Sequence, residues 1–217
     1  MSLPFSRSEF FGVFAAYNTA IWPLQVVAAL LGLTSIALLC RRTAWSGTAI
    51  AGVLSAFWLV TGIGYHWLHF SAINNAARAF GILFALQALV FLIEGVIRGR
   101  MSFDWSNGIR GWLAAALIAY GFAVYPLVGL LLAHPWPGTP LFGVAPCPTT
   151  IHTLAFLMLL RHPHPWSVAA IPLFWSIVGG SAAFLLDVPQ DLGLLAAALL
   201  WLVAAILPRK AVNRSVA

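Results

Sequence analysis

Long apolar runs separated by short polar or proline-rich breaks dominate the chain. Seven such runs lie at about 22–40, 45–68, 76–97, 111–133, 149–160, 166–186 and 192–207. A helix needs roughly 20 apolar residues to cross about 30 Å of hydrocarbon, and most of the runs have that length. The pattern therefore predicts seven membrane-spanning helices joined by short connections.

A shorter segment with a mixed pattern precedes these runs. Over residues 7–20, Phe10, Phe11 and Phe14 alternate with polar residues such as Glu9 and Asn18. This mixture is typical of a helix that lies in the membrane interface. We therefore expect an all-α fold, a polytopic membrane helix bundle, with residues 1–217 forming a single membrane domain.

The composition agrees with a protein whose main solvent is lipid. Of the 217 residues, 62% are hydrophobic and 7% are charged, whereas soluble domains carry about 25% charged residues. The formal charge of +6 is scattered singly and in pairs, so it forms no basic face for nucleic acid. The lipid bilayer is the expected partner, and self-association into a homo-oligomer stays open.

The basic residues predict the orientation in the membrane. In a seven-span arrangement one side carries Arg41, Arg42, Arg98, Arg100, Arg110, Arg161, Arg209, Lys210 and Arg214. Only Arg7 and Arg78 fall on the other side. Because cytoplasmic loops are enriched in Arg and Lys, the N-terminus is expected outside and the C-terminus in the cytoplasm.

Two segments resemble each other. AWSGTAI at Ala44–Ile50 matches PWSVAAI at Pro165–Ile171 in four positions, and the same offset places His66 opposite Asp187. This similarity predicts spans one to three and five to seven as parallel repeats joined by the fourth, a 3+1+3 arrangement. The alternative is chance similarity between two apolar segments.

The fifth run is too short to cross a bilayer. From Thr149 to Arg161 a helix covers only about 20 Å. Pro146 and Pro148 interrupt any helix upstream, so Leu141–Pro148 is expected to enter the membrane as irregular chain. The first N–H groups of the short helix would then face a cavity as unpaired donors. The alternatives are a thinner bilayer, or a short helix that is merely capped by its threonines.

Polar side chains gather near the same depth. Thr149, His152 and Thr153 share one helix face, and His66 and His69 share another. With Cys147 or Asp187, the histidines offer nitrogen, sulfur and oxygen ligands to a transition metal, although interfacial histidines are often simply solvated. The candidate ligand-binding residues are His66, Cys147, Thr149, His152, Thr153 and Asp187. The candidate metal ligands are His66, His69 and His152.

No sequence motif indicates catalysis. The chain has no phosphate-binding loop, nucleophile elbow or dinucleotide fingerprint. We therefore expect no catalytic residues and no cofactor, with a transition metal or haem as the alternative.

Several segments together resemble a known family. They are PFSRSEFFGVFAAYNTAIWPLQ, YHWLHFSAINNAARAFG, FGVAPCPTTIHT and GGSAAFLLDVPQDLGLL. They are similar to an uncharacterised family of bacterial multi-pass membrane proteins, known only as a domain of unknown function and sometimes labelled permeases. The resemblance implies an inner-membrane location and covers nearly the whole chain. His69 and His152 stand where the family commonly has apolar residues, which argues against a family-wide metal role for them.

The leading functional hypothesis is a permease-like carrier for a small solute, with its site where the interrupted fifth span meets the second and sixth. The alternatives are a membrane-embedded metal- or haem-binding protein with a redox function, and a non-catalytic partner subunit. The carrier hypothesis is motivated by the short fifth run behind a proline-rich segment, together with polar residues that would be costly against lipid.

Overall fold

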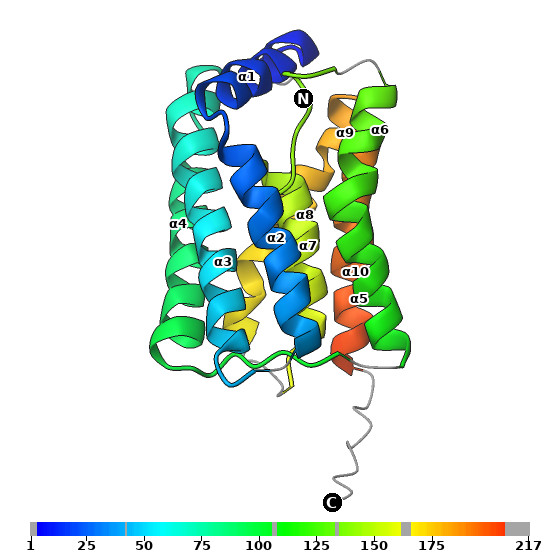
Figure 1. Ribbon diagram of the computed structural model, residues 1–217. Coiled ribbons are helices and arrows are strands. Elements are labelled where there is room, and N and C mark those ends of the chain that lie inside the picture. The colour runs from blue at the N-terminus through cyan, green and yellow to red at the C-terminus, as the bar shows by residue number, and fades with distance from the viewer. Residues whose placement is uncertain (1–3, 42, 106–107, 133–134, 162–165, 207–217) are drawn as a thin grey trace, which may run out of the picture.

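The computed structural model describes residues 4–41, 43–105, 108–132, 135–161 and 166–206, and these form an all-helical bundle (Figure 1). Within these ranges the only β-type pairing is a single bridge between Phe103 and Leu160. The helix bounds follow the apolar runs closely because the connections between runs are short and rich in Gly, Pro and polar residues.

Six continuous helices among the described residues are long and apolar enough to cross a membrane, which indicates a multi-pass membrane protein. Three of them lie in the first half: α2 (Leu24–Arg41); α3 (Ser46–Val60) with η1 (Thr61–His69) and η2 (Phe70–Ala72); and α4 (Ala77–Phe91) with η3 (Leu92–Ile97). The other three are α5 (Ile109–Ala119) with η4 (Tyr120–Val124) and α6 (Tyr125–Leu131); η5 (Trp166–Val168) with α8 (Ala170–Gly180) and α9 (Ala182–Leu185); and η6 (Pro189–Asp191) with α10 (Leu192–Ile206).

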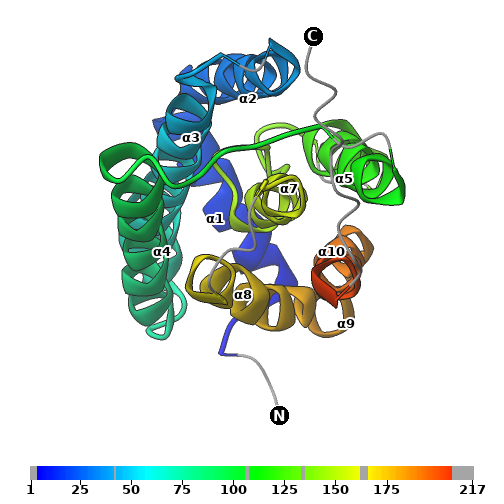
Figure 2. The same ribbon diagram turned by 90° about the horizontal axis from the view of Figure 1, so that it is seen from below.

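The remaining inner helix, α7 (Pro146–Met158), has only 13 residues. It corresponds to a length of about 20 Å, so it does not meet the length of a spanning helix. Every one of its residues is buried, and the other helices surround it in the view along the bundle (Figure 2). The six long helices thus account for six of the seven expected spans, and a seventh span at α7 stays a prediction.

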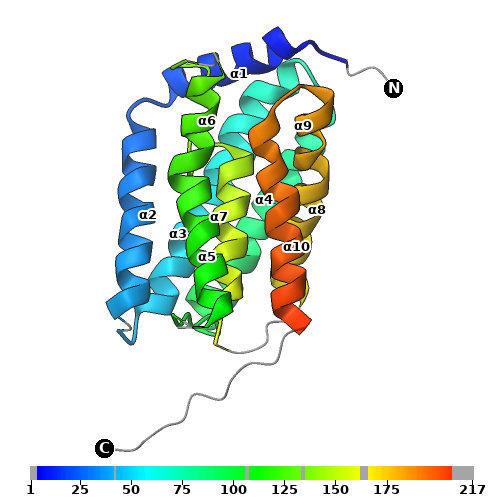
Figure 3. The same ribbon diagram turned by 90° about the vertical axis from the view of Figure 1, so that its right-hand side faces the viewer.

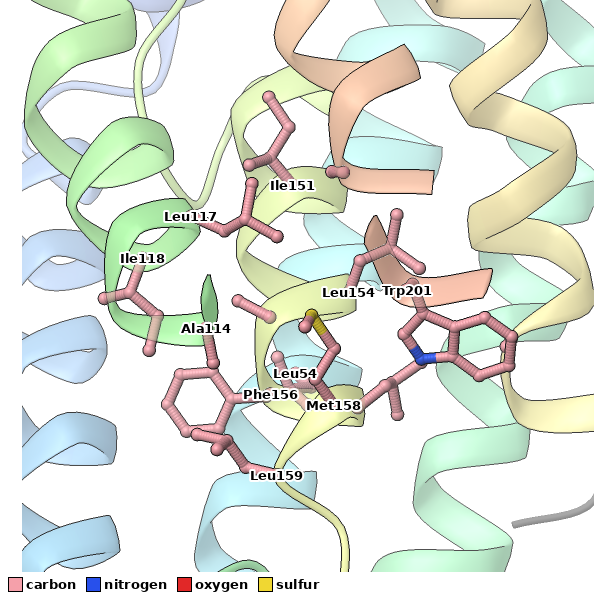
Figure 4. Packing of buried hydrophobic residues seen from close by; sticks show 14 of the residues in the cluster. Leu54, Ala114, Leu117, Ile118, Ile151, Leu154, Phe156, Met158, Leu159 and Trp201 are labelled. Atoms are coloured by element: carbon pink, nitrogen blue, oxygen red, sulfur yellow. The ribbon is translucent and has the colours of Figure 1, made fainter. Parts of the chain in front are cut away.

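Large apolar side chains from α7 fill the centre of the bundle. Ile151, Leu154 and Phe156 are fully buried and belong to the same hydrophobic cluster as Ala114 of α5 and Trp201 of α10 (Figure 4). Small residues bring neighbouring helices close to α7. A Cβ added at Gly121 would lie 2.9 Å from the Pro148 carbonyl oxygen, so only glycine permits this approach between η4 and α7.

Helix α1 (Arg7–Ala20) lies across one end of the bundle (Figures 1 and 3). It begins with a capping box, in which the Ser6 side chain accepts from the Glu9 amide and the Glu9 carboxylate accepts from the Ser6 amide. Its inner face buries Phe10, Phe14 and Tyr17. The mixed pattern over residues 7–20 therefore does form a separate helix that covers the bundle.

The opposite end of the bundle carries the basic helix ends. Helix α2 ends there, η3 ends there and α5 begins there (Figure 1). Arg41, Arg98, Arg100, Arg110 and Arg161 consequently lie at that end, whereas Arg7 and Arg78 lie on helices that start at the α1 end. Arg42, Arg209, Lys210 and Arg214, which contributed to the predicted orientation, fall outside the described residues.

The residues paired by the repeat hypothesis have different environments. The offset that pairs His66 with Asp187 also pairs Ser55 with Ser176. Ser55 donates to the Ala88 carbonyl oxygen of α4, whereas Ser176 donates to the Pro172 carbonyl oxygen of its own helix. His66 is fully buried, while the Asp187 side chain is 83% exposed. The parallel repeat stays a prediction.

Candidate functional site

The chain enters the bundle as irregular backbone just before α7. Residues 141–145 form turns, four of the five are buried, and Gly143 has a left-handed φ of +76°. Helix α1 holds this segment, because the Tyr17 hydroxyl donates to the Val144 carbonyl oxygen at 3.0 Å. Irregular chain was expected over Leu141–Pro148, and the structure instead begins α7 at Pro146, two residues before Pro148. Proline is well suited to the first position of a helix, which explains the earlier start.

The two prolines also change the expected chemistry of the helix start. Pro146 and Pro148 carry no N–H group, and the Thr149 amide donates to the Ala145 carbonyl oxygen at 3.4 Å. Cys147 is then the one residue among the first three of α7 that has an amide hydrogen. The row of unpaired donors expected from the sequence is thereby reduced to a single group.

A cavity of about 200 Å³ lies next to this helix start, between α1 and the inner helices. We call it the Asp191 cavity. Its polar lining residues are Tyr65, Asn74, Tyr125, Cys147, Trp175, Ser181 and Asp191. Its apolar lining includes Phe5, Phe10 and Phe14 from α1 and the segment before it. The lining of the cavity is therefore mainly apolar, with many aromatic rings and a few polar groups, as is common in small-molecule sites.

Asp191 is the buried acid of this cavity. It is 1% exposed, and its Oδ1 accepts a 2.6 Å hydrogen bond from the Tyr125 hydroxyl. The Cys147 thiol lies beside the same carboxyl group. Asp191 stands directly before the first residue of α10 and next to the start of α7, and both helix N-termini favour negative charge. The Tyr125 hydroxyl and the two helix N-termini thus stabilise part of the negative charge that Asp191 carries when it is ionised.

The second carboxyl oxygen has no such support. No hydrogen-bond donor contacts Asp191 Oδ2 within the part of the chain that the structure describes. The Tyr65 hydroxyl, also buried, has no partner there either. Buried polar groups are normally hydrogen-bonded, so two unpartnered oxygens on residues that line the same cavity make it a candidate binding site.

Aromatic rings form a continuous wall behind these oxygens. Phe14 stacks on Tyr65 with ring centroids 4.5 Å apart, and Tyr65 stacks on Phe70 at 5.5 Å. Trp175 meets Phe80 edge to face at 5.3 Å. Because the rings support one another, the cavity wall is held in a fixed shape.

His66 lies behind this wall and does not line the cavity. Its ring packs against Phe84 at 4.7 Å and against Trp175 at 4.9 Å. Neither ring nitrogen has a hydrogen-bond partner among the described residues. Of the sequence candidates, Cys147 is a cavity-lining residue. His66 is separated from the cavity by rings that line it, those of Tyr65, Phe70, Phe80 and Trp175.

The other α7 candidates point into the helix packing. Thr153 donates to the Thr149 carbonyl oxygen at 2.8 Å and accepts from Trp58 Nε1 at 2.9 Å. The His152 ring packs between Phe142 and Phe156. The structure therefore places Thr149, His152 and Thr153 in buried positions away from the lining of the Asp191 cavity.

Asp187 and His69 have partners of their own. Asp187 forms an exposed ion pair with Arg7 at 3.4 Å, and its φ of 53° is left-handed. His69 Nδ1 lies 2.7 Å from the Gly64 carbonyl oxygen of the same helix. Within the described ranges, no group of three or more His, Cys, Asp or Glu side chains is placed to hold a metal ion. The proposed His66, His69 and His152 ligand set is not brought together.

Sequence reasoning missed Asp191 and Tyr125 as partners. Asp191 could have been considered from the sequence, because the chain has only five acidic residues and Asp191 stands at the start of an apolar run. Asp187, four residues earlier, carries the same signal and is exposed. Three-dimensional packing alone distinguishes the two.

Comparison with known proteins places the chain in a family. No curated protein and no solved structure matches it. One family model matches residues 7–216, and its description names neither a membrane nor a transported solute. That match takes in α1 and every inner helix, including all residues of the Asp191 cavity from Phe10 onward. The chain belongs to the family of unknown function DUF6064.

Proposed function

We propose that this protein is a permease-like membrane carrier that binds a small solute in the Asp191 cavity. The observation that supports the proposal most is the buried carboxyl group of Asp191, which lines a cavity of about 200 Å³ and whose Oδ2 has no hydrogen-bond donor among the described residues. An ionisable side chain at membrane depth is costly and usually serves function. A purely structural role would leave both carboxyl oxygens bonded.

The position of the cavity fits a carrier. It lies at the α1 end of the bundle, where the Phe10 and Phe14 side chains close it. The α7 start beside it follows irregular backbone, and such interrupted helices mark the binding sites of many transporters. By the distribution of basic residues we assign the α1 end to the outside and the basic end to the cytoplasm of a bacterial inner membrane.

The helix geometry near the cavity also supports bending of the long helices during transport. Tyr65 belongs to η1 and Tyr125 follows η4 directly, and both η segments are wide helical turns of the π type. Such turns are frequent at functional sites because they loosen the regular backbone ladder. We propose that η1 and η4 are the places where the long helices bend when the cavity opens.

The proposal can be tested without knowing the solute, because Cys147 is a native reporter inside the cavity. The exposed Cys40 is first replaced by serine. Membrane vesicles of either orientation are then treated with a small, membrane-impermeant thiol reagent. A carrier exposes its site alternately to the two sides, so Cys147 should be modified in both orientations.

Each outcome has a defined meaning. Modification of Cys147 from both sides supports the carrier. Modification from the α1 side alone, with none from the basic side, would identify a binding protein or receptor and overturn the carrier proposal. Wild-type Cys40, which is exposed near the basic end, serves as the control that the reagent reaches one side only.

A further inference from the structure

We propose that the solute of the Asp191 cavity is a small organic ammonium ion, an amine with an apolar body. This inference rests on the proposed function, since it names the chemical class that the same site would take. Four features support it: a carboxyl group without a basic partner, two unpartnered oxygens, an aromatic lining and a limited volume.

The first feature is the charge of the site. No ion pair joins Asp191 to any basic side chain in the ranges that the structure describes, and its recorded neighbours are Tyr125 and Cys147. Burying a carboxylate without a counter-ion carries a desolvation cost. A cation brought in by the ligand removes that cost. An anionic ligand would add a second negative charge and increase it.

The second feature is the geometry of donors and acceptors. Asp191 Oδ2 and the Tyr65 hydroxyl oxygen are both buried and lack partners among the described residues. A primary ammonium group carries three N–H donors, which is enough for both oxygens. A neutral alcohol can also pair with both groups, by donating to Oδ2 and accepting from the Tyr65 hydroxyl, but it brings no charge to balance the carboxylate.

The third feature is the aromatic lining. Tyr65, Tyr125 and Trp175 line the cavity together with the rings of Phe10, Phe14 and Phe80. The negative faces of aromatic rings attract cations, and the attraction is strongest when water is excluded. A bare metal ion would instead need several oxygen ligands, which this wall of rings does not offer.

The volume limits the size of the ligand. A cavity of about 200 Å³ is somewhat larger than the roughly 150 Å³ cavity that holds one benzene molecule. The ligand is therefore about as large as benzylammonium. Its apolar part would lie against the phenylalanine side chains of α1, and its ammonium group would lie at Asp191.

Three probes of equal size separate charge from shape: benzylammonium, benzyl alcohol and benzoate. Binding to the full-length protein in lipid nanodiscs is measured by calorimetry and by protection of Cys147 from thiol modification. We expect benzylammonium to bind with a Kd roughly tenfold or more below that of benzyl alcohol, because a desolvated cation gains both ring and carboxylate contacts. Benzoate should not protect Cys147.

Variants then test whether Asp191 causes the preference for benzylammonium over benzyl alcohol. Asp191→Asn keeps the shape and removes the charge, so it should bind benzylammonium and benzyl alcohol with similar affinity. Asp104→Asn is the matched control, because Asp104 pairs with Arg161 at the basic end. It should retain the wild-type preference. The wild-type probe series decides the question even if Asp191→Asn does not fold.

The outcomes separate this inference from the carrier proposal. Equal or better binding of benzyl alcohol or benzoate by the wild type would overturn the ammonium inference while leaving a solute site in place. Retention of the cation preference in Asp191→Asn would overturn it as well. Cation-selective binding with Cys147 reachable from one side alone would support the ammonium site and contradict the carrier.

Discussion

The Tyr125 hydroxyl donates to Asp191 Oδ1 across 2.6 Å, although the two residues are 66 positions apart in the chain. This bond joins α6 to the start of α10 at the wall of the Asp191 cavity. Both side chains are buried, so the contact fixes the carboxyl group, while Oδ2 has no hydrogen-bond partner among the described residues. One hydrogen bond therefore serves both the packing of two helices and the orientation of the candidate ligand-binding group.

Tyr125→Phe removes this bond while keeping the ring. A hydrogen bond to a charged group contributes about 1.5–3 kcal/mol, so the free energy of unfolding should fall by about that amount. Binding of any solute at Asp191 should weaken too, because the carboxyl group loses its fixed rotamer. Unfolding in detergent with added denaturant measures the first effect, and calorimetry measures the second.

Tyr120→Phe is the control for this prediction. The Tyr120 hydroxyl donates to the Gln190 carbonyl oxygen at 2.8 Å, one residue from Asp191, and it is only half-buried. Its loss should cost about 0.5–1.5 kcal/mol and leave solute binding unchanged. Equal effects of the two variants would show that the Asp191 bond has no special role.

Much of the fold follows from the apolar pattern. The expected runs at 22–40 and 76–97 correspond to helices Leu24–Arg41 and Ala77–Ile97, because a spanning helix must be continuous and apolar and the breaks between runs are rich in Pro, Gly and polar residues. The place of α7 in the centre could not be predicted in the same way. The apolar pattern shows which residues avoid water, but it does not distinguish a helix surrounded by lipid from one surrounded by protein. All sides of α7 are buried against protein.

The site was predictable only in part. Cys147 was named as a possible sulfur ligand near the start of the short fifth run, and it lines the cavity. Tyr125 resembles any other interfacial tyrosine in the sequence, and its role depends on a contact with a helix 66 residues away. The prediction for His152 went the other way. Its helix face was expected to line a cavity, and its ring instead packs between Phe142 and Phe156.

Gly121→Ala should disrupt the central packing. The new Cβ would lie 2.9 Å from the Pro148 carbonyl oxygen, which is backbone and cannot move aside. Overpacking of this kind costs about 1–3 kcal/mol, which should lower the melting temperature in detergent. Gly52→Ala is the matched control, because its Cβ would meet only Val96 Cγ2 at 3.8 Å. A melting temperature for Gly121→Ala as high as that of the control would contradict the close contact.

The docking of α1 should depend on pH through Glu9. The hydrogen bond from the Ser6 backbone, followed by that from its side chain, lowers the pKa of Glu9 below its ordinary value of 4.5. Because the folded pKa is the lower one, the stabilisation is present above pH 4.5 and is lost as the pH falls through the folded pKa. Hydrogen exchange of α1 amides, referenced to α4 in the same sample, should rise at low pH. Glu9→Gln should remove that pH dependence.

Reporter fusions test the orientation that the basic residues predict. Fusions after Arg100 and Arg161 should report the cytoplasm, and fusions after Asn75 and Gly138 should report the outside. The reason is that Arg100 follows η3 and Arg161 follows α7 at the basic end, whereas Asn75 comes just before α4 and Gly138 lies near the Phe11 backbone of α1. A cytoplasmic signal after Gly138 would reverse the assignment of the two ends.

Phe14→Ala should open the Asp191 cavity from the α1 side. Phe14 is 1% exposed, stacks on Tyr65 at 4.5 Å and lines the cavity. Truncating a buried phenylalanine costs about 3–5 kcal/mol, and here most of that loss falls on the contact between α1 and the bundle. The inner helices keep their own packing, so the protein should remain inserted while Cys147, in a Cys40→Ser background, reacts faster with a thiol reagent.

The control for Phe14 lies on the same helix. Gly12 faces away from the bundle, and a Cβ added there meets no atom within 4 Å. Gly12→Ala should strengthen α1 by up to about 1 kcal/mol through helix propensity, so Cys147 should react at the wild-type rate or more slowly. If Phe14→Ala and Gly12→Ala gave the same labelling rate, α1 would not be the cover of the cavity, and a ligand would have to enter between the inner helices instead.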